Sequence, residues 1–235
     1  MRTDATDALR EGDLRLVGLM PRASNYTFLA EVVAGDRATP VVYKPREGEM
    51  PLWDFPDGTL CQREVAAFRL ASALGWPNVP ATVLRDGPHG EGSVQRFVKA
   101  EPGEHFFTLQ DRRVEDFRAV AAFDAIVANG DRKAGHCLLG VDGTLWVVDH
   151  GLCFSERPML RTVIWDFAGE PLPEALAEDV RRVAGDLRSG SLRAELLELL
   201  SPAEVDAAAD RAEGLVRAGR FPAPGPGRSH PWPAI

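Results

Sequence analysis

The sequence has few cysteines and no long apolar run. Its three cysteines, Cys61, Cys137 and Cys153, form no CxxC pair, which argues against a disulfide framework or a zinc ribbon and suits a reducing compartment. The most apolar stretch, Ala119 to Ala128, is interrupted by Asp124, so it is too short to span a bilayer. The N-terminus lacks the apolar core of a secretory signal. We therefore expect a cytoplasmic protein whose cysteines are small buried residues.

Lysine is also scarce. The three lysines are Lys44, Lys99 and Lys133, and arginine supplies the rest of the permanently basic side chains. A lysine retained in such a chain hints at a role that arginine cannot fill. Acidic residues outnumber basic ones, 35 to 27, which gives a formal net charge of −8. A surface of this sign repels nucleic-acid phosphates and anionic membranes, so the sequence predicts neither as a partner.

Turn residues and hydrophobic periodicity predict an α+β chain. Before residue 100, β-branched and aromatic runs alternate with Gly, Pro and Asn, which is typical of a small antiparallel sheet. One helix, Gln62 to Leu74, is predicted after the third strand, because apolar residues recur there at helical spacing as far as Gly75. The predicted strands cover residues 14–20, 26–33, 39–44, 81–84 and 93–98.

Helical periodicity dominates after residue 100. Residues 114–128 predict one helix and residues 173–219 two or three more. Between them, two apolar runs joined by Asp142-Gly143 predict a tight hairpin. We predict an N-terminal nucleotide-binding lobe over 1–100 and a helical catalytic lobe over 101–220. A proline-rich tail, 221–235, is expected to be extended or disordered.

Some polar residues of the first lobe are candidates for nucleotide binding. Lys44 ends a strand and Glu64 lies early in the next helix; a nucleotide site needs a cation that touches the phosphates and is held by a carboxylate. Ser24 and Asn25 lie in a turn whose N–H groups could cover phosphates, although the turn lacks the glycines of a phosphate-binding loop. The structural alternatives are a solvated lysine with an unrelated glutamate, and an ordinary hairpin.

Two aspartates carry the strongest signal. Asp131 lies in a loop after a helix, and Asp149 ends an apolar run just before His150 and Gly151. The hairpin between them is short enough to return Asp149 beside the loop of Asp131. Phosphoryl transfer needs a carboxylate near the acceptor hydroxyl and acidic ligands for a metal that bridges the phosphates. The alternative is that both aspartates are turn and cap residues.

The pattern Asp131-Arg132, an apolar hairpin, then Val148-Asp149-His150-Gly151 resembles the phosphatidylinositol 3-/4-kinase-like superfamily, which is related at a distance to HipA-type kinases and protein kinases. The resemblance is best to the type II 4-kinase-like form and a small bacterial branch. It covers about residues 14–154 and implies a two-lobe protein-kinase-like fold that binds ATP and Mg²⁺ or Mn²⁺. The implied site residues are Lys44 and Glu64 for phosphate binding, Phe97 and Val98 at the hinge that reads adenine, Asp131 and Arg132 for catalysis, and Asp149 for metal.

One position departs from that family. Its members place asparagine, a second metal ligand, five residues after the catalytic aspartate, where this chain has His136. Imidazole can bind divalent metal, although magnesium prefers oxygen; a histidine satisfied within a turn is the alternative. We therefore expect an ATP-dependent phosphotransferase that acts on a soluble protein or small-molecule hydroxyl. The alternatives are a pseudokinase that binds nucleotide and regulates a protein partner, and an enzyme that transfers AMP.

Overall fold

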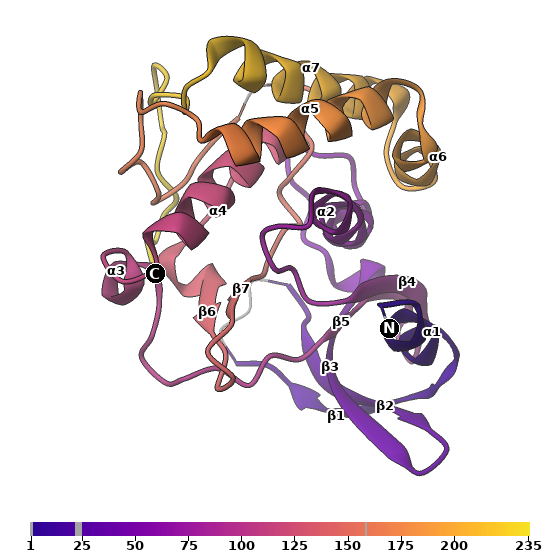
Figure 1. Cartoon of the computed structure of the whole chain (residues 1–235). Coiled ribbons are helices and arrows are strands. Elements are labelled where there is room, and N and C mark those ends of the chain that lie inside the picture. Colours follow the sequence, from indigo (N-terminus) through magenta and orange to yellow (C-terminus); the bar gives the residue numbers. More distant parts are fainter. Residues whose placement is uncertain (1, 22–24, 158) are drawn as a thin grey trace.

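The computed structural model describes residues 2–21, 25–157 and 159–235, and its elements form two lobes (Figure 1). The N-terminal lobe is built on an antiparallel sheet with strand order β1-β2-β3-β5-β4. Its strands are β1 (Asp13–Leu19), β2 (Phe28–Ala34), β3 (Arg37–Pro45), β4 (Thr82–Gly87) and β5 (Gly90–Arg96). β3 is the central strand, and Lys44 near its end is opposite Ser93 of β5.

Helix α2 (Leu60–Leu74) follows β3 after a 3-10 turn, Arg46–Gly48. It ends at Gly75, whose φ of 91° is readily adopted by glycine and whose N–H donates to the carbonyl of Ala71. Figure 1 shows α2 between the sheet and the C-terminal helices. The helix is therefore placed to carry side chains into the junction of the two lobes.

The C-terminal lobe is mainly helical. Its elements are α3 (Phe106–Leu109), α4 (Val114–Val127), the 3-10 turn Ala134–His136, the hairpin β6 (Cys137–Leu139) with β7 (Leu145–Val147), α5 (Glu174–Ser189), α6 (Ser191–Leu197) and α7 (Pro202–Ala218). Helix α7 begins at a capping box in which Ser201 and Glu204 each accept the other's backbone N–H. None of the described helices is long and apolar enough to cross a bilayer.

Two apolar clusters hold these elements together. The smaller cluster lies on the sheet and includes Leu14, Val41 and Val94. The larger one joins α2, through Val65 and Leu70, to the helices and hairpin of the C-terminal lobe. The buried face of α2 belongs to the larger cluster, and the helix also contacts β4 and β5, so it packs with both lobes.

The predicted α+β fold, with an antiparallel sheet, an inserted helix and a helical second lobe, is confirmed. A helix that the sequence analysis did not predict, α1 (Arg2–Glu11), precedes the sheet. Leu9 is buried in the cluster on the sheet, and Nη1 of Arg85 donates to the carbonyls of Leu9 and Gly12. Tertiary contacts therefore stabilise this short polar segment, since an isolated helix of this length is marginal in water.

The proline-rich tail, 221–235, is extended but lies against the C-terminal lobe (Figure 1). The N–H of Thr162 donates to the carbonyl of Ser229 at 3.1 Å, and the N–H of Ala134 donates to the carbonyl of Ala234 at 2.8 Å. The second bond attaches the tail to the 3-10 turn that follows Asp131, and the first attaches it to the segment 159–165.

Candidate active site

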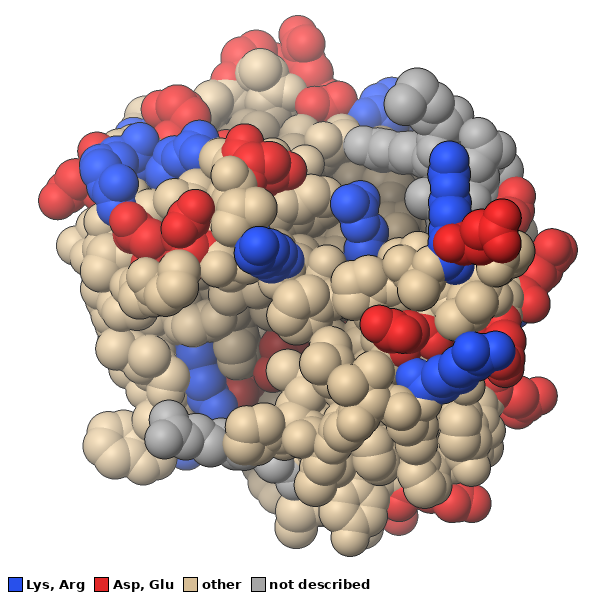
Figure 2. Space-filling model, turned by 90° about the horizontal axis from the view of Figure 1, so that it is seen from below, with Lys and Arg blue, Asp and Glu red and all other residues tan. Residues whose placement is uncertain are grey.

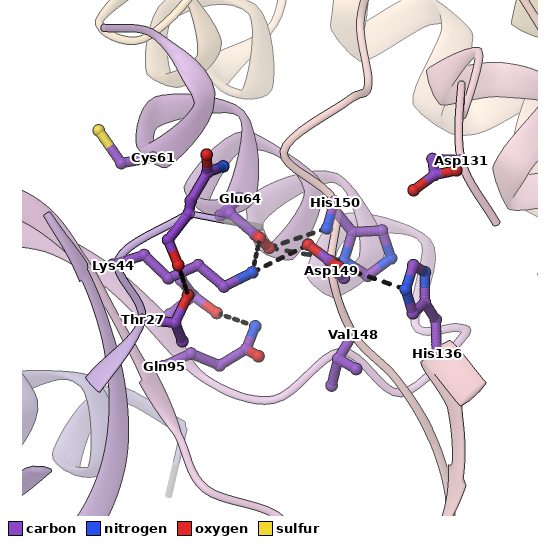
Figure 3. Close-up of polar contacts among 12 residues, drawn as sticks. Thr27, Lys44, Cys61, Glu64, Gln95, Asp131, His136, Val148, Asp149 and His150 are labelled. Carbon is purple, nitrogen blue, oxygen red and sulfur yellow. Dashed lines mark hydrogen bonds and ion pairs between the residues drawn. The ribbon is translucent and has the colours of Figure 1, made fainter. Parts of the chain in front are cut away.

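Lys44 from β3 contacts carboxylates from two other elements. Its Nζ donates to Oε1 of Glu64 on α2 and, at 3.0 Å, to Oδ1 of Asp149 after β7. Burial alone would lower the pKa of Lys44, but the Asp149 and Glu64 carboxylates outweigh it and raise that pKa well above its usual range. The same ammonium lowers the pKa of Asp149 far below its usual range. The structure thus brings together a permanent cation and two carboxylates from distant parts of the chain (Figure 3).

Asp149 is held in an uncommon backbone conformation. Its φ is +63°, in the left-handed region that non-glycine residues rarely adopt. The next residue, His150, is buried and donates its backbone N–H to Oε2 of Glu64 at 2.9 Å. Glu64 therefore holds both the cation of β3 and the backbone beside Asp149, which keeps Asp149 in this strained geometry.

Arg132 is buried beneath the loop that contains Asp131. Its Nε and Nη2 donate to both carboxylate oxygens of Asp124 at 2.9 Å, and its Nη1 donates to the carbonyl of Val148 at 3.0 Å. A fourth contact, at 2.8 Å, joins Nη2 to Nε2 of His150. The side chain is 0% exposed, so it cannot touch an acceptor molecule. This corrects the prediction of Arg132 as a catalytic residue: the guanidinium holds Asp124 of α4 and the backbone at Val148, between β7 and Asp149.

Asp131 lies on the His136 side of the Lys44–Asp149 pair (Figure 3). Its Oδ2 is 3.1 Å from Nζ of Lys133, and its backbone N–H donates to Oδ1 of Asn129 at 3.0 Å. Burial raises the pKa of Asp131 above the ordinary aspartate value, against the opposing effect of Lys133. A carboxylate with a raised pKa accepts a proton more readily than an exposed one.

His136 faces Asp149. Its Nε2 is 3.3 Å from Oδ2 of Asp149, and its Nδ1 accepts the backbone N–H of Lys133 at 3.4 Å. Burial lowers the pKa of His136 to about 4, so the ring is neutral at pH 7. With Nδ1 as acceptor, the single ring proton lies on Nε2, which then donates to Asp149. This tautomer has no free lone pair on Nε2 for a metal, so the predicted ligation by His136 would require the other tautomer.

Asp149 has few further metal ligands of its own around it. In the described ranges, no three His, Cys, Asp or Glu side chains cluster as a complete metal site would require. The Asp149 carboxylate lies beside a cation and a ring N–H, and its side chain is half exposed. A divalent ion at this point would have to take its remaining ligands from phosphate oxygens and water, as Mg²⁺ commonly does.

The other predicted nucleotide contacts lie in other segments, before β2 and after β5. Asn25 follows the undescribed residues 22–24, so the predicted role of Ser24 lies outside the described residues. Oδ1 of Asn25 accepts the N–H of Met50 at 2.9 Å, which fixes it within its own loop. Phe97 and Val98 follow β5 in the segment that connects the lobes. The Phe97 N–H is already bonded to the carbonyl of Pro40, which leaves Val98 as the better candidate to read a base.

The sequence analysis did not assign Lys133, Asp124 or Asn129 to the site. Lys133 pairs with Asp131, and Asp124 anchors both Arg132 and Asn129, whose Nδ2 donates to Oδ1 of Asp124 at 3.0 Å. The scarcity of lysine was a signal that could have found Lys133. A single aspartate within the apolar face of α4 was the corresponding signal for Asp124, because a buried charge needs a partner.

Solved kinase structures resemble this fold. The crystal structure of the Golgi casein kinase with Mn/ADP bound has a TM-score of 0.58 at 16% identity, covering 92% of this chain and 75% of that chain. The structure of hydra Fam20 with sugar has a TM-score of 0.60 at 12% identity, covering 92% and 87%. The chain therefore has a kinase-like fold.

A relative in sequence gives the family. Protein Rv2133c of Mycobacterium tuberculosis is 37% identical over 271 aligned positions, which span 100% of this chain and 97% of that protein. The chain belongs to the family of that protein. No family model matches the sequence.

Proposed function

We propose that this protein is an ATP-dependent phosphotransferase that acts on the hydroxyl group of a soluble protein or small molecule. The observation that carries the proposal is the contact of Lys44 with both Glu64 and Asp149. The three residues come from three separate parts of the chain. The kinase-like fold supports the same function, and the proposed relationship to phosphatidylinositol 3-/4-kinases rests on the motif from Asp131 to Gly151.

Lys44 is the proposed phosphate ligand. In this structure its ammonium is bound by two carboxylates, so it is oriented and permanently charged before a nucleotide arrives. Glu64 would keep it in place while phosphate oxygens compete with Asp149 for its N–H donors. Backbone groups at Phe97 and Val98 are proposed to contact the base, with Val98 as the free donor.

Asp131 is the proposed proton acceptor. As the acceptor hydroxyl attacks the γ-phosphorus, its proton passes to the Asp131 carboxylate and a new oxygen–phosphorus bond forms. The bond between the γ-phosphorus and the β,γ-bridging oxygen breaks, and ADP leaves with that electron pair. Lys133, whose Nζ is 3.1 Å from Oδ2 of Asp131, is proposed to contact the transferred phosphoryl group.

Asp149 is the proposed ligand for Mg²⁺ or Mn²⁺. A bound divalent ion would neutralise the charge that develops on the phosphates. We propose that His136 orients Asp149 by donating from Nε2, in place of the direct metal contact predicted from the sequence. The 3.3 Å contact between the two side chains is the basis for this assignment.

The first experiment measures nucleotide binding by thermal melting. ATP with Mg²⁺ or Mn²⁺ at 100 times its dissociation constant should add roughly 2.7 kcal/mol to the stability and raise Tm. Lys44→Ala should abolish the shift. Arg37→Ala removes an exposed cation from the same strand and should leave the shift intact. An equal shift in wild type and Lys44→Ala would refute the assignment of Lys44.

The second experiment identifies the reaction. The purified protein is incubated with ATP and each metal, and the products are separated by chromatography. ADP is expected; AMP would instead indicate AMP transfer. His136 stands where the family that the sequence resembles has a metal-binding asparagine. This difference favours one further candidate, a nucleotide-binding protein that regulates a partner without transferring phosphate. Binding without either product, for the wild type with both metals, would support that candidate.

A further inference from the structure

A large cavity lies in the C-terminal lobe, away from Lys44. It has a volume of about 610 Å³, which is the size of a small-molecule site. Its walls are α7, the segment 159–165 and the beginning of the tail, 220–229. In Figure 1 this segment and the tail run side by side next to α4 and α7. The cavity has no role in the proposed transfer reaction, so its chemistry must be explained separately.

The charge of this cavity is opposite to that of the chain. Its lining includes Arg161, Arg211, Arg220 and Arg228 and none of the described aspartates or glutamates. The chain as a whole has a net charge of −8. None of the four arginines forms an ion pair with a described carboxylate, whereas arginines such as Arg188 on the outer surface of α5 do. Four unpaired guanidinium groups around one cavity make a site for an anion.

The hydrogen bonds of these arginines lead to the same conclusion. Arg211 donates from Nε to the carbonyl of Ile126 at 2.7 Å and from Nη1 to that of Ser155 at 3.0 Å. Its Nη2 is buried and has no hydrogen-bond partner. Burial lowers the pKa of Arg211 to about 10. A largely buried cation whose hydrogen bonds go only to neutral carbonyls is unfavourable. The Asp210 carboxylate offsets part of this, and a bound anion would compensate it further.

The remaining walls are apolar. Trp165 lines the cavity and is held by a 3.1 Å hydrogen bond from its Nε1 to the carbonyl of Ser229. Leu215 and Phe221 supply buried apolar surface on the neighbouring sides. Such walls bind an aromatic or aliphatic group better than they bind water. A bare inorganic ion would leave them without a partner.

We propose that this cavity binds a soluble molecule that carries a phosphate or carboxylate on an apolar body, with the anion held by Arg161, Arg211 and Arg228. The site is separate from the nucleotide site at Lys44 and goes beyond the proposed transfer reaction. It adjoins the catalytic loop, since the N–H of Arg161 donates to the carbonyl of Asn129 at 2.8 Å. The Arg228 charge also reaches Asp131, whose pKa it lowers against the effect of burial.

The test uses calorimetric titration of the full chain with three probes. 2-Naphthyl phosphate has both the anion and the apolar body, inorganic phosphate has only the anion, and 2-naphthol has only the ring. We expect 2-naphthyl phosphate to bind at least tenfold more tightly than either of the others. Inorganic phosphate binding as tightly would overturn the apolar part of the proposal, and equal binding of 2-naphthol would overturn the anionic part.

Variants then locate the site. Arg161→Gln with Arg228→Gln should weaken 2-naphthyl phosphate binding at least tenfold. Arg157→Gln with Arg217→Gln removes the same charge from exposed positions that do not line the cavity and should have little effect. Equal losses in the two double variants would reject the site. Lys44→Ala should keep the binding of the probe, which separates this proposal from that of the nucleotide site.

A last arm distinguishes a soluble ligand from a lipid headgroup. Vesicles of phosphatidylcholine with phosphatidic acid present the same phosphate on a membrane. We expect no co-sedimentation of the protein with them at physiological salt. Binding that Arg161→Gln with Arg228→Gln abolishes would overturn the soluble ligand in favour of a lipid.

Discussion

Two of the three lysines are found beside aspartates of the candidate site. Lys44 is 3.0 Å from Asp149, and Lys133 is 3.1 Å from Asp131. A lysine ammonium is a compact point charge on a flexible stem, so it can move between a carboxylate and a phosphate. This is a physical reason for lysine at both places in a chain whose other permanent cations are arginines.

At Asp131 we predict a pH-dependent reaction. Burial raises its pKa above the ordinary value of about 3.9. A proton acceptor must be ionised, so turnover should fall as the pH drops through the raised pKa of Asp131. This fall should occur at a higher pH than an ordinary aspartate would give. Asp131→Asn should lower turnover by about 10²–10⁴-fold at pH 7. The measurement is ADP production against pH.

The effect of pH on stability at Asp131 is opposite to that of a carboxylate whose pKa is lowered by an ion pair, because burial outweighs Lys133 here. A raised folded pKa means that the folded state is penalised when Asp131 ionises, and this penalty is absent below the unfolded pKa. Asp131→Asn should therefore raise Tm slightly at pH 7 and have no effect in acid. Asp166→Asn, at an exposed position, is the control. A lower Tm for Asp131→Asn at pH 7 would contradict the role of burial.

At His136 we predict a gain in metal affinity on substitution. Asparagine would present a carbonyl oxygen where the neutral ring presents an N–H to Asp149, and Mg²⁺ prefers oxygen. His136→Asn should therefore lower the Mg²⁺ concentration needed for ATP binding without weakening binding with Mn²⁺. Thermal melting over a series of metal concentrations measures both. A loss of Mn²⁺ affinity would instead identify the imidazole as a metal ligand.

Helix α2 connects the two lobes through polar contacts as well as through apolar ones. Arg63 is 1% exposed; its Nη2 pairs with Glu204 of α7 and its Nη1 donates to the carbonyl of Cys153 at 2.8 Å. Glu64, the next residue, reaches the other way to Lys44 and to the backbone of His150. The rotation of α2 is thereby fixed from both sides, and with it the position of Lys44.

This arrangement predicts a stability difference between two ion pairs of the same helix. Arg63→Met should reduce the free energy of unfolding by about 3–5 kcal/mol, because it leaves the buried Glu204 carboxylate without its partner. Arg69→Met breaks a pair whose Glu198 side chain is 66% exposed and should lose about 1 kcal/mol or less. Urea unfolding of the two variants checks the prediction; similar losses would show that the buried pair has no special role.

On the face shown in Figure 2, the molecule has no large basic surface. Blue and red side chains are scattered there among broad uncharged areas. Together with the net charge of −8, this leaves the face shown poorly suited to an anionic membrane, where each basic residue contributes about 1 kcal/mol.

We predict that phosphoinositide is not the substrate. The protein should not co-sediment with phosphatidylserine vesicles at physiological salt, and it should not label phosphatidylinositol in the presence of ATP and metal. Arg37→Glu, which makes the exposed start of β3 more acidic, should leave both results unchanged. Labelling of the lipid by the wild-type protein would refute the prediction.

The sequence by itself determined the elements that have strong local patterns. β-Branched and aromatic runs and the Asp142-Gly143 turn located strands, and helical spacing located α2 and α4 within one or two residues. These features depend on residues that are close in the sequence, so a sequence pattern can reveal them. The same holds for the spacing of Asp131 and Asp149, since only a short hairpin separates them.

The tertiary structure alone decided which side chains are buried and which distant residues meet. Lys44 and Asp149 are 105 residues apart, Arg132 is buried against Asp124, and α1 is held by Arg85. The four arginines of the cavity come from three segments that show no common pattern. Such contacts arise because packing of the whole chain, rather than local preference, fixes where a charge can find its partner.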